Sequence, residues 1–340
     1  MATIDEVARL AGVSIATVSR VLNRNYPVSE KSRARVMAAV EALGYQTNLA
    51  GRMLRTNTSR TLLVAFSVLI PAFMDAVIET ANVYDHTILF SYCLPHLTHT
   101  EPLKPLYTGM ADGVIYLNVM LEPAVFADVC SRYPAVLCGD MRDYAAPDVH
   151  RIVVDNETMA RRMTEHLLDK GCRRIGCVGV RDAQGQITQF SREREQGVRK
   201  ALAARGLAPE PAWVFHGDGS FEGGRAAADA LAVQTGKAMV DGLFCFTDTI
   251  AIGCIRRLSE RGIRVPDDLR VAGFDDIDPA RHLIPSLSTV AQPFDAMGRE
   301  CVLRLVRPER YPEAGQHRIA GQLVIRESTG GGGTPDTPSN

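Results

Sequence analysis

The first 23 residues constrain the fold most, because their pattern predicts two short helices separated by a tight glycine turn. Thr3 followed by Glu6 forms a capping box, so the first helix should begin at this point. Gly12 should end this helix. The apolar positions that follow helical spacing, and that we expect to be buried, are Val7, Leu10 and Ala11.

A second helix follows the turn, and Ser14 is placed to cap it. Its inward positions are Val18, Val21 and Leu22, and its opposite face carries Ile15, Ala16, Ser19 and Arg20. We expect this exposed face to read DNA, as the second helix of a helix-turn-helix motif does. The alternative is a purely structural helix pair, since the same geometry occurs in small bundles.

Two further features favour the DNA-binding interpretation. Ser29 starts a third helix, which ends at Gly44 and carries one apolar face made of Val36, Ala39, Val40 and Leu43. Residues 1–60 contain nine Lys and Arg against four Asp and Glu, a net charge of +5, whereas the rest contains 29 against 35, a net charge of −6. Such an asymmetry is expected where one end of a chain meets phosphates.

The chain has 340 residues, 46% of them hydrophobic, and is long enough for more than one domain. Its longest apolar stretch, residues 62–74, is too short to span a bilayer, and no signal segment precedes the first helix. We therefore expect a cytoplasmic protein with no membrane partner. The eight cysteines form no Cys-x-x-Cys pair, so we expect reduced, buried thiols, with no metal site and no cofactor.

From residue 61 onward, short apolar strands alternate with helices, a pattern typical of parallel α/β sheets. The predicted strands are residues 62–65, 87–90, 113–117, 135–138, 152–154, 175–178, 243–246 and 271–273. The predicted helices include residues 158–170, 193–205, 221–234 and 249–261, and Gly171, Gly206 and Gly262 suit helix ends. This length exceeds one ordinary domain, so we expect two doubly wound lobes with a ligand cleft between them.

Ordered motifs extend this pattern to nearly the whole chain. The head contains Thr3-Ile4-x-x-Val7-Ala8-x-x-Ala11-Gly12-Val13-Ser14-x-x-Thr17-Val18-Ser19-Arg20-Val21-Leu22-Asn23, and the body contains Asp248-x-x-Ala251-x-Gly253, Gly273-Phe274-Asp275-Asp276 and Thr289-x-x-Gln292-Pro293. From residue 2 to about 328, the chain resembles the lactose-repressor (LacI/GalR) family of bacterial transcription regulators. Residues 274–278, 291–293 and 323–329 look most like its cytidine-responsive branch, although these segments are mostly scaffold.

The resemblance implies a helix-turn-helix domain at residues 1–46, a hinge helix and linker at 47–60, and an effector-binding and dimerisation domain at 61–328. Its first lobe would comprise about 61–156 and 290–314, and its second about 157–289 and 315–328. The tail at 329–340 has no apolar anchor and should be disordered. It also lacks the leucine heptads of a C-terminal helical bundle, which argues against a tetramer assembled through this end.

The resemblance also implies a homodimer on a palindromic, double-stranded DNA operator. Ile15 and Ala16 would occupy the specificity positions and suit thymine methyl groups, while Arg20 could reach a guanine. Thr17 and Ser19 would contact phosphates. The full set of implied DNA-binding residues is Thr3, Ser14, Ile15, Ala16, Thr17, Ser19, Arg20, Asn23, Ser29, Asn48, Ala50 and Leu54.

The hinge would span residues 48–55 and place Leu54 as a wedge at the central base step. A free helix of this length is marginal in water, so we expect it to fold only on DNA. The alternative is a linker helix that packs Leu54 against its own body.

In the cleft, the resemblance assigns effector contacts to Arg194 and Asp248 from the second lobe and to Phe73 from the first. An Arg and an Asp in one pocket can bracket the hydroxyls of a sugar or the ribose of a nucleoside, and the alternative is an interlobe ion pair without ligand contact. The family usually has an aromatic residue after its Gly-Asp motif, but this chain has Gly219, with Phe221 two residues on as the candidate stacking residue.

Two other functions compete with a regulator. An enzyme is one, because Gly176-Cys177-Val178-Gly179 follows a predicted strand, but no dinucleotide, Walker or nucleophile-elbow motif is present. Asp275, Asp276 and Asp278 are interpreted as a solvated or interlobe turn rather than a metal cluster. A cytoplasmic or transport-associated solute-binding protein is the other, and the DNA-reading head argues against it.

Overall fold

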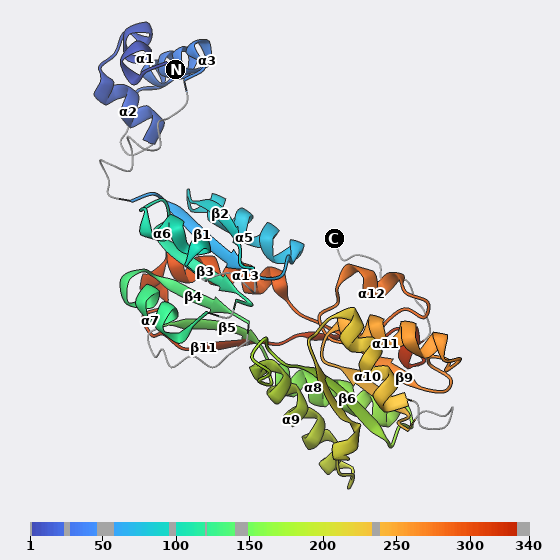
Figure 1. The fold of residues 1–340 in the computed structure, drawn as a ribbon. Coiled ribbons are helices and arrows are strands. Elements are labelled where there is room, and N and C mark those ends of the chain that lie inside the picture. The colour runs from blue at the N-terminus through green and yellow to red at the C-terminus, as the bar shows by residue number, and fades with distance from the viewer. Residues whose placement is uncertain are drawn as a thin grey trace. The chain divides into compact units, whose positions relative to one another are not determined.

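The computed structural model describes residues 2–23, 28–45, 58–94, 100–119, 121–139, 149–232 and 239–331. The chain divides into two compact units, residues 1–59 and 60–340 (Figure 1). Each unit has its own hydrophobic core. No helix among the described residues is long and apolar enough to cross a membrane. The expected hinge residues Asn48, Ala50 and Leu54 lie outside the described residues.

The smaller unit contains the three predicted helices: α1 (Ile4–Ala11), α2 (Ile15–Asn23) and α3 (Glu30–Leu43). Their shared core consists of Val7, Ala8, Ala11, Val18, Val21, Val36 and Ala39. The expectation that Leu10 is buried is wrong, because this side chain is 57% exposed. The buried stripe of α1 passes through Val7, Ala8 and Ala11 at helical spacing, and Leu10 lies off this stripe.

The first lobe of the larger unit is a parallel sheet of order β11-β5-β4-β3-β1-β2. Its strands are β1 (Thr61–Phe66), β2 (Thr87–Tyr92), β3 (Gly113–Leu117), β4 (Ala135–Cys138), β5 (His150–Val154) and β11 (Gln316–Ile319). Helices α5 (Pro71–Val83) and α13 (Phe294–Val306) cover one face, and α6 (Lys104–Tyr107) and α7 (Pro123–Arg132) cover the other.

The second lobe is a parallel sheet of order β7-β6-β8-β9. Its strands are β6 (Ile175–Val180), β7 (Val214–Gly217), β8 (Gly242–Cys245) and β9 (Arg270–Ala272). Helices α8 (Asn156–Asp169) and α9 (Gln189–Ala204) cover one face, while α10 (Phe221–Ala232) and α11 (Asp248–Glu260) cover the other. The short α12 (Asp278–His282) follows β9. Across the larger unit as a whole, short 3₁₀ turns also occur at Glu101–Leu103, Pro211–Trp213, Pro308–Arg310 and Glu327–Thr329.

Both sheets are buried on both faces, which explains why their central strands are continuous apolar runs. In β1, for example, Leu62 and Val64 join the core under α5 and α13, whereas Leu63 and Ala65 join the core under α6 and α7. This alternation confirms the predicted doubly wound arrangement in two lobes.

The lobes are connected through β10 (Thr289–Ala291), which pairs with β12 (Gln322–Val324) in an antiparallel ribbon. The expected assignment of residues 315–328 to the second lobe is wrong at its start. Residues 316–319 form β11, which pairs in parallel with β5 and extends the first-lobe sheet. The backbone hydrogen bonds that β11 forms with β5, at the edge of that sheet, therefore place this segment in the first lobe.

Several local expectations are tested by the structure. Gly171, Gly206 and Gly262 follow α8, α9 and α11 with φ of 94°, 67° and 72°, as helix ends of this type require.

All eight cysteines are free, and only Cys130 among them is not fully buried. The tail does not begin at Thr329, since this residue is buried and its hydroxyl bonds with His166 at 2.9 Å. Residues 332–340 lie outside the described residues.

Candidate functional site

The turn before α2 fixes how this helix is presented. Gly12 ends α1 in the left-handed conformation, with φ of 61°, and the backbone amide of Thr17 donates to Oγ of Ser14 at 3.2 Å. Ser14 therefore caps α2 as predicted. With Val18 and Val21 buried, the helix turns its other face to solvent.

That outer face places the predicted base-reading residues together. Ile15, Ala16 and Arg20 are exposed, and Thr17 and Ser19 are half-buried beside them. Two apolar side chains and one guanidinium on the exposed side of one helix can meet thymine methyl groups and a guanine edge in a major groove. The side chain of Asn23 lies outside the described residues.

Thr3 and Ser29 serve as helix caps in this structure. Glu6 accepts a 2.7 Å bond from the backbone amide of Thr3, while Oγ1 of Thr3 accepts from the amide of Glu6 at 3.3 Å, which confirms the capping box. Oγ of Ser29 accepts from the amide of Ser32 at 3.3 Å at the start of α3. Their predicted contacts with phosphate remain predictions.

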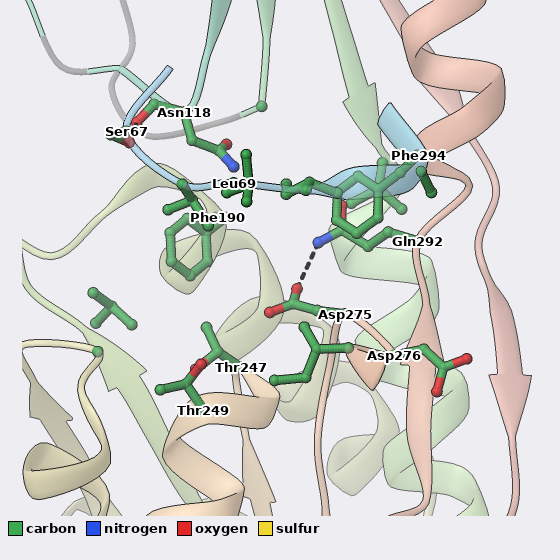
Figure 2. A pocket seen from close by; sticks show the side chains of 18 of the residues that line it. Ser67, Leu69, Asn118, Phe190, Thr247, Thr249, Asp275, Asp276, Gln292 and Phe294 are labelled. Carbon is green, nitrogen blue, oxygen red and sulfur yellow. Dashed lines mark hydrogen bonds between the residues drawn. The ribbon is translucent and has the colours of Figure 1, made fainter. Parts of the chain in front are cut away.

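A cavity of about 760 Å³ lies between the two lobes of the larger unit, within the size range of small-molecule sites. Figure 2 shows Ser67, Leu69 and Asn118 of the first lobe facing Thr247 and Thr249 of the second lobe. Other lining residues include Ile70, Pro71, Asn156, Val180, Phe190, Arg194, Asp218, Gly219, Asp275, Asp276, Asp278, Arg281, Gln292 and Phe294. The cavity lies beyond the carboxyl ends of the strands, where doubly wound sheets bind ligands.

Arg194 lines this cavity as predicted and is held firmly. Its Nε donates to Oδ1 of Asn156 at 2.8 Å, and its Nη1 donates to the carbonyl of Phe246. Its guanidinium carbon lies 3.4 Å from the ring centroid of Phe274 and 4.8 Å from that of Phe190. Only about 3% of the residue is exposed, so a preorganised guanidinium lies at the cavity wall.

The carboxylate that accompanies Arg194 is Asp275, not Asp248. Oδ1 of Asp275 lies 4.0 Å from Nη1 of Arg194 and accepts a 2.6 Å bond from the side-chain amide of Gln292 (dashed in Figure 2). Burial raises the pKa of Asp275, and the positive charge of Arg194 acts against this rise. Asp275 and Asp276 both have positive φ, 124° and 56°, a conformation that is rare for residues other than glycine.

Asp248 lies beneath the cavity and does not line it. Its Oδ1 accepts from the hydroxyl of Thr289 at 2.6 Å, and its Oδ2 accepts from the amide of Ile277 at 2.9 Å. The side chain is fully buried, so the expected effector contact is corrected to a structural role. Both carboxylate oxygens already have donors, and these bonds hold the segments around the acidic turn.

The two expected aromatic contacts also lie elsewhere. Phe73 is fully buried in the core between α5 and the first-lobe sheet. The residues that line the cavity in this region are the preceding ones, 67–72. Phe221 is half-exposed at the start of α10 and does not line the cavity. Gly219 does line it, with φ of 81°, and a Cβ there would lie 3.3 Å from Val180. The aromatic lining comes from Phe190 and Phe294.

The lining residues that sequence reasoning missed had a usable signal. Asp275 follows strand β9 within three residues, and Gln292 directly follows β10. Side chains just after the carboxyl ends of parallel strands are the ones that face such a cleft, and Asp275 meets this rule. Asp248 lies equally far after β8, so the rule alone does not separate the two carboxylates. Their separation comes from the structure, in which Asp248 is buried and Asp275 lines the cavity.

Comparison with known proteins supports both units. The model of bacterial regulatory proteins of the lacI family matches residues 3–48, and that of the periplasmic binding protein-like domain matches residues 164–329. The transcriptional repressor CytR of Escherichia coli K12 is 32% identical over 338 residues, covering 96% of each chain. The repressor PurR of Aliivibrio salmonicida is 31% identical, covering 96% of this chain and 99% of the relative.

Among solved structures, the lac repressor dimer bound to operator and the anti-inducer ONPF aligns with a TM-score of 0.79. It is 27% identical and covers 96% of this chain and 99% of that chain. A helix-turn-helix unit joined to a two-lobed, periplasmic-binding-protein-like body defines a class of bacterial transcription regulators. This chain belongs to the lacI family of these regulators.

Proposed function

We propose that the chain is a cytoplasmic repressor that binds a palindromic operator as a homodimer and is controlled by a sugar or nucleoside in the cleft. The observation that carries this proposal is the presence, in one chain, of the exposed α2 face and of the Arg194–Asp275 pair in the cavity between the lobes. One feature reads DNA, and the other reads a small molecule.

In this proposal Ile15 and Ala16 contact thymine methyl groups, Arg20 contacts a guanine, and Thr17 and Ser19 position the helix on phosphates. The basic head supplies the phosphate affinity that any sequence shares. Asn23, Asn48, Ala50 and Leu54 keep their proposed DNA contacts, with Leu54 as the wedge in the minor groove.

The dimer would form through the first lobe. β2 is an edge strand of its sheet, and it exposes Phe90 and Tyr92. The neighbouring α5 exposes Ile78 and Val83, the latter 78% exposed. Contiguous apolar side chains on one face favour a protein partner. A second copy is the proposed partner, since the lac repressor structure that matches over nearly the whole chain is a dimer.

In the cleft, Arg194 donates to ligand hydroxyl oxygens and Asp275 accepts from ligand hydroxyl groups. Vicinal hydroxyls of a sugar or a ribose present both functions at the right separation for one guanidinium and one carboxylate. Binding here would alter the segments that connect the lobes, because Gln292 bonds to the same carboxylate.

Operator selection from random DNA, followed by anisotropy titration and sedimentation of the complex, tests the DNA half of this proposal. We expect an inverted-repeat motif, one dimer per site, and a change in operator affinity when a stabilising sugar or nucleoside is added. Thermal-shift measurement with sugars and nucleosides identifies that ligand, because native-state binding raises stability. A monomer on a non-symmetric site would overturn the proposal.

A further inference from the structure

The acidic turn at the cavity contains two adjacent carboxylates, and each faces a different arginine. Oδ1 of Asp275 lies 4.0 Å from Nη1 of Arg194, whereas Oδ1 of Asp276 accepts a 2.8 Å bond from Nη1 of Arg326. Figure 2 shows the two carboxylates pointing apart. We infer that Arg326 is a positioning residue of the effector site, and this inference rests on the proposed function of the cleft. By pairing with Asp276, it leaves Asp275 as the carboxylate that faces Arg194.

Arg326 does not line the cavity and lies 50 residues beyond Asp276 in the sequence. It follows β12, and only about 8% of the residue is exposed. The same Nη1 also donates to the carbonyl of Leu287 at 2.9 Å, and the backbone amide of Arg326 donates to Oγ of Ser288 at 2.8 Å. These bonds fix the guanidinium on the segment that leads into β10.

The residues that follow Arg326 are held by the second lobe as well. Oγ of Ser328 donates to the carbonyl of Val271 at 2.6 Å, and the hydroxyl of Thr329 bonds with His166 of α8 at 2.9 Å. Ser328 and Thr329 are both fully buried. The second lobe therefore fixes the place of this arginine on both sides.

The turn that carries the two carboxylates needs such a contact. Asp275 and Asp276 have φ of 124° and 56°, and residues other than glycine keep this conformation only where surrounding contacts hold it. Asp275 has contacts of its own, since its amide donates to the carbonyl of Val290 at 2.8 Å and Gln292 donates to its carboxylate. Among the described residues, the hydrogen-bond donor to the Asp276 carboxylate is Arg326.

The pairing also balances charge at the cavity wall. The side chain of Asp276 is 19% exposed and that of Arg326 is 9% exposed, so water screens this ion pair only in part. Removing one partner of a buried ion pair leaves an uncompensated charge, which is costly. Without Arg326, the turn would rearrange to bring Asp276 to water or to another cation. Because Asp275 belongs to the same turn, its place opposite Arg194 would change with it.

Calorimetry with five probes tests this role: cytidine, adenosine, D-ribose, D-glucose and D-galactose. The probe that binds the parent most tightly is used for all variants. Arg326→Met removes the cation and should weaken this binding by about tenfold, a coupling within the range found inside one ion-pair network. Adding Asp276→Asn to Arg326→Met should recover most of the loss, because a neutral amide needs no cation. Arg326→Lys, which keeps the positive charge, should lose less than Arg326→Met.

Two measurements separate positioning from a general effect on folding. Arg256→Met is the matched control, because this arginine is 73% exposed and neither it nor its partner Glu260 lines the cavity. It should bind the probe as the parent does. The melting temperature of each variant is also recorded, since a purely structural arginine would lower it without changing the probe affinity of the folded protein. Should Arg326→Met not fold, Arg326→Gln, which keeps a donor without the charge, replaces it with the same expectations.

Each contrary outcome has its own meaning. If Arg326→Met bound the probe as tightly as the parent, or if Asp276→Asn recovered none of the loss, the inference would be overturned and the proposed effector site would stand. If no probe bound the parent, or if Asp275→Asn bound the probe as tightly as the parent, the proposed effector site would be wrong and the inference with it.

Discussion

Gln292 donates a 2.6 Å hydrogen bond to Asp275, and this bond joins the segment that enters α13 of the first lobe to the acidic turn of the second. The same carboxylate oxygen faces Arg194 at 4.0 Å. In the proposed function, a ligand hydroxyl would share this carboxylate with Gln292. The proposed effector contact and a hydrogen bond that links the lobes therefore involve the same side chain.

The first prediction concerns this carboxylate. Asp275→Asn should weaken effector binding by about tenfold to a hundredfold, since a hydrogen bond to a charged group contributes about 1.5–3 kcal/mol. Without effector, the affinity of the variant for operator should stay within about twofold of the parent. The effector changes operator affinity only when it is bound, through the coupling free energy between the two sites. Calorimetry and operator anisotropy measure the two quantities. If Asp275→Asn bound the effector as tightly as the parent, Asp275 would not be a contact.

The second prediction is a pH dependence of stability. Burial, together with the nearby charge of Asp275, raises the pKa of Asp248 to about 7. The folded state then binds a proton that the unfolded chain releases near pH 4, so the free energy of unfolding should fall as pH rises from about 4 to 7. Asp248→Asn should reduce this slope, as measured by denaturant titration at several pH values.

Asp268 is the control of opposite sign. Its hydrogen bonds with Arg264 lower its pKa to about 2. Its contribution to stability is therefore present above pH 4 and is lost as pH falls toward 2. Asp268→Asn should leave the slope between pH 4 and 7 unchanged. Equal slopes in the parent and in Asp248→Asn would refute the proposed proton on Asp248.

The third prediction concerns the packing of α8 against α9. A Cβ on Gly197 would lie 2.3 Å from the carbonyl oxygen of Glu157, which is backbone and cannot move aside. Gly197→Ala should lower the free energy of unfolding by about 1–3 kcal/mol, the usual cost of overpacking. Gly315→Ala is the matched control, since no atom lies within 4 Å of its added Cβ. Chemical denaturation measures the free energy of unfolding of both variants. If Gly197→Ala were as stable as Gly315→Ala, the prediction would be contradicted.

Most strands that the sequence predicted are strongly buried, and the edge strand β2 is an exception. Strands β1, β3, β6 and β8 are covered on both faces and are continuous apolar runs. The strands missed include β7 and β11, at sheet edges, where half-buried and polar residues such as His216 and Arg318 interrupt the apolar pattern. Their pairing is decided by backbone partners distant in sequence, which a local pattern does not contain.

The site divides in the same way. Arg194 was predictable, but the choice among Asp275, Asp276 and Asp278 was not, because three nearby carboxylates look equivalent in sequence. The left-handed backbone at Asp275 and Asp276 directs the first toward Arg194 and the second toward Arg326. The position of Phe73 likewise depends on the rotation of α5, which is set by its packing under β1 and α13.

The last prediction tests how α2 reads DNA. Arg20 is exposed on the same helix face as Ile15 and Ala16, whereas Arg9 lies in the last turn of α1. If Arg20 contacts a guanine edge, Arg20→Ala should weaken binding to the preferred operator by about 1–3 kcal/mol and relax the preference at one base pair in each half-site. Arg9→Ala is the control for lost positive charge, and it should weaken all sequences slightly and equally. Selection from random DNA followed by affinity measurement at fixed salt gives both quantities for both variants. A preferred motif that Arg20→Ala leaves intact, with affinity reduced uniformly, would make Arg20 a phosphate contact and leave base reading to Ile15 and Ala16.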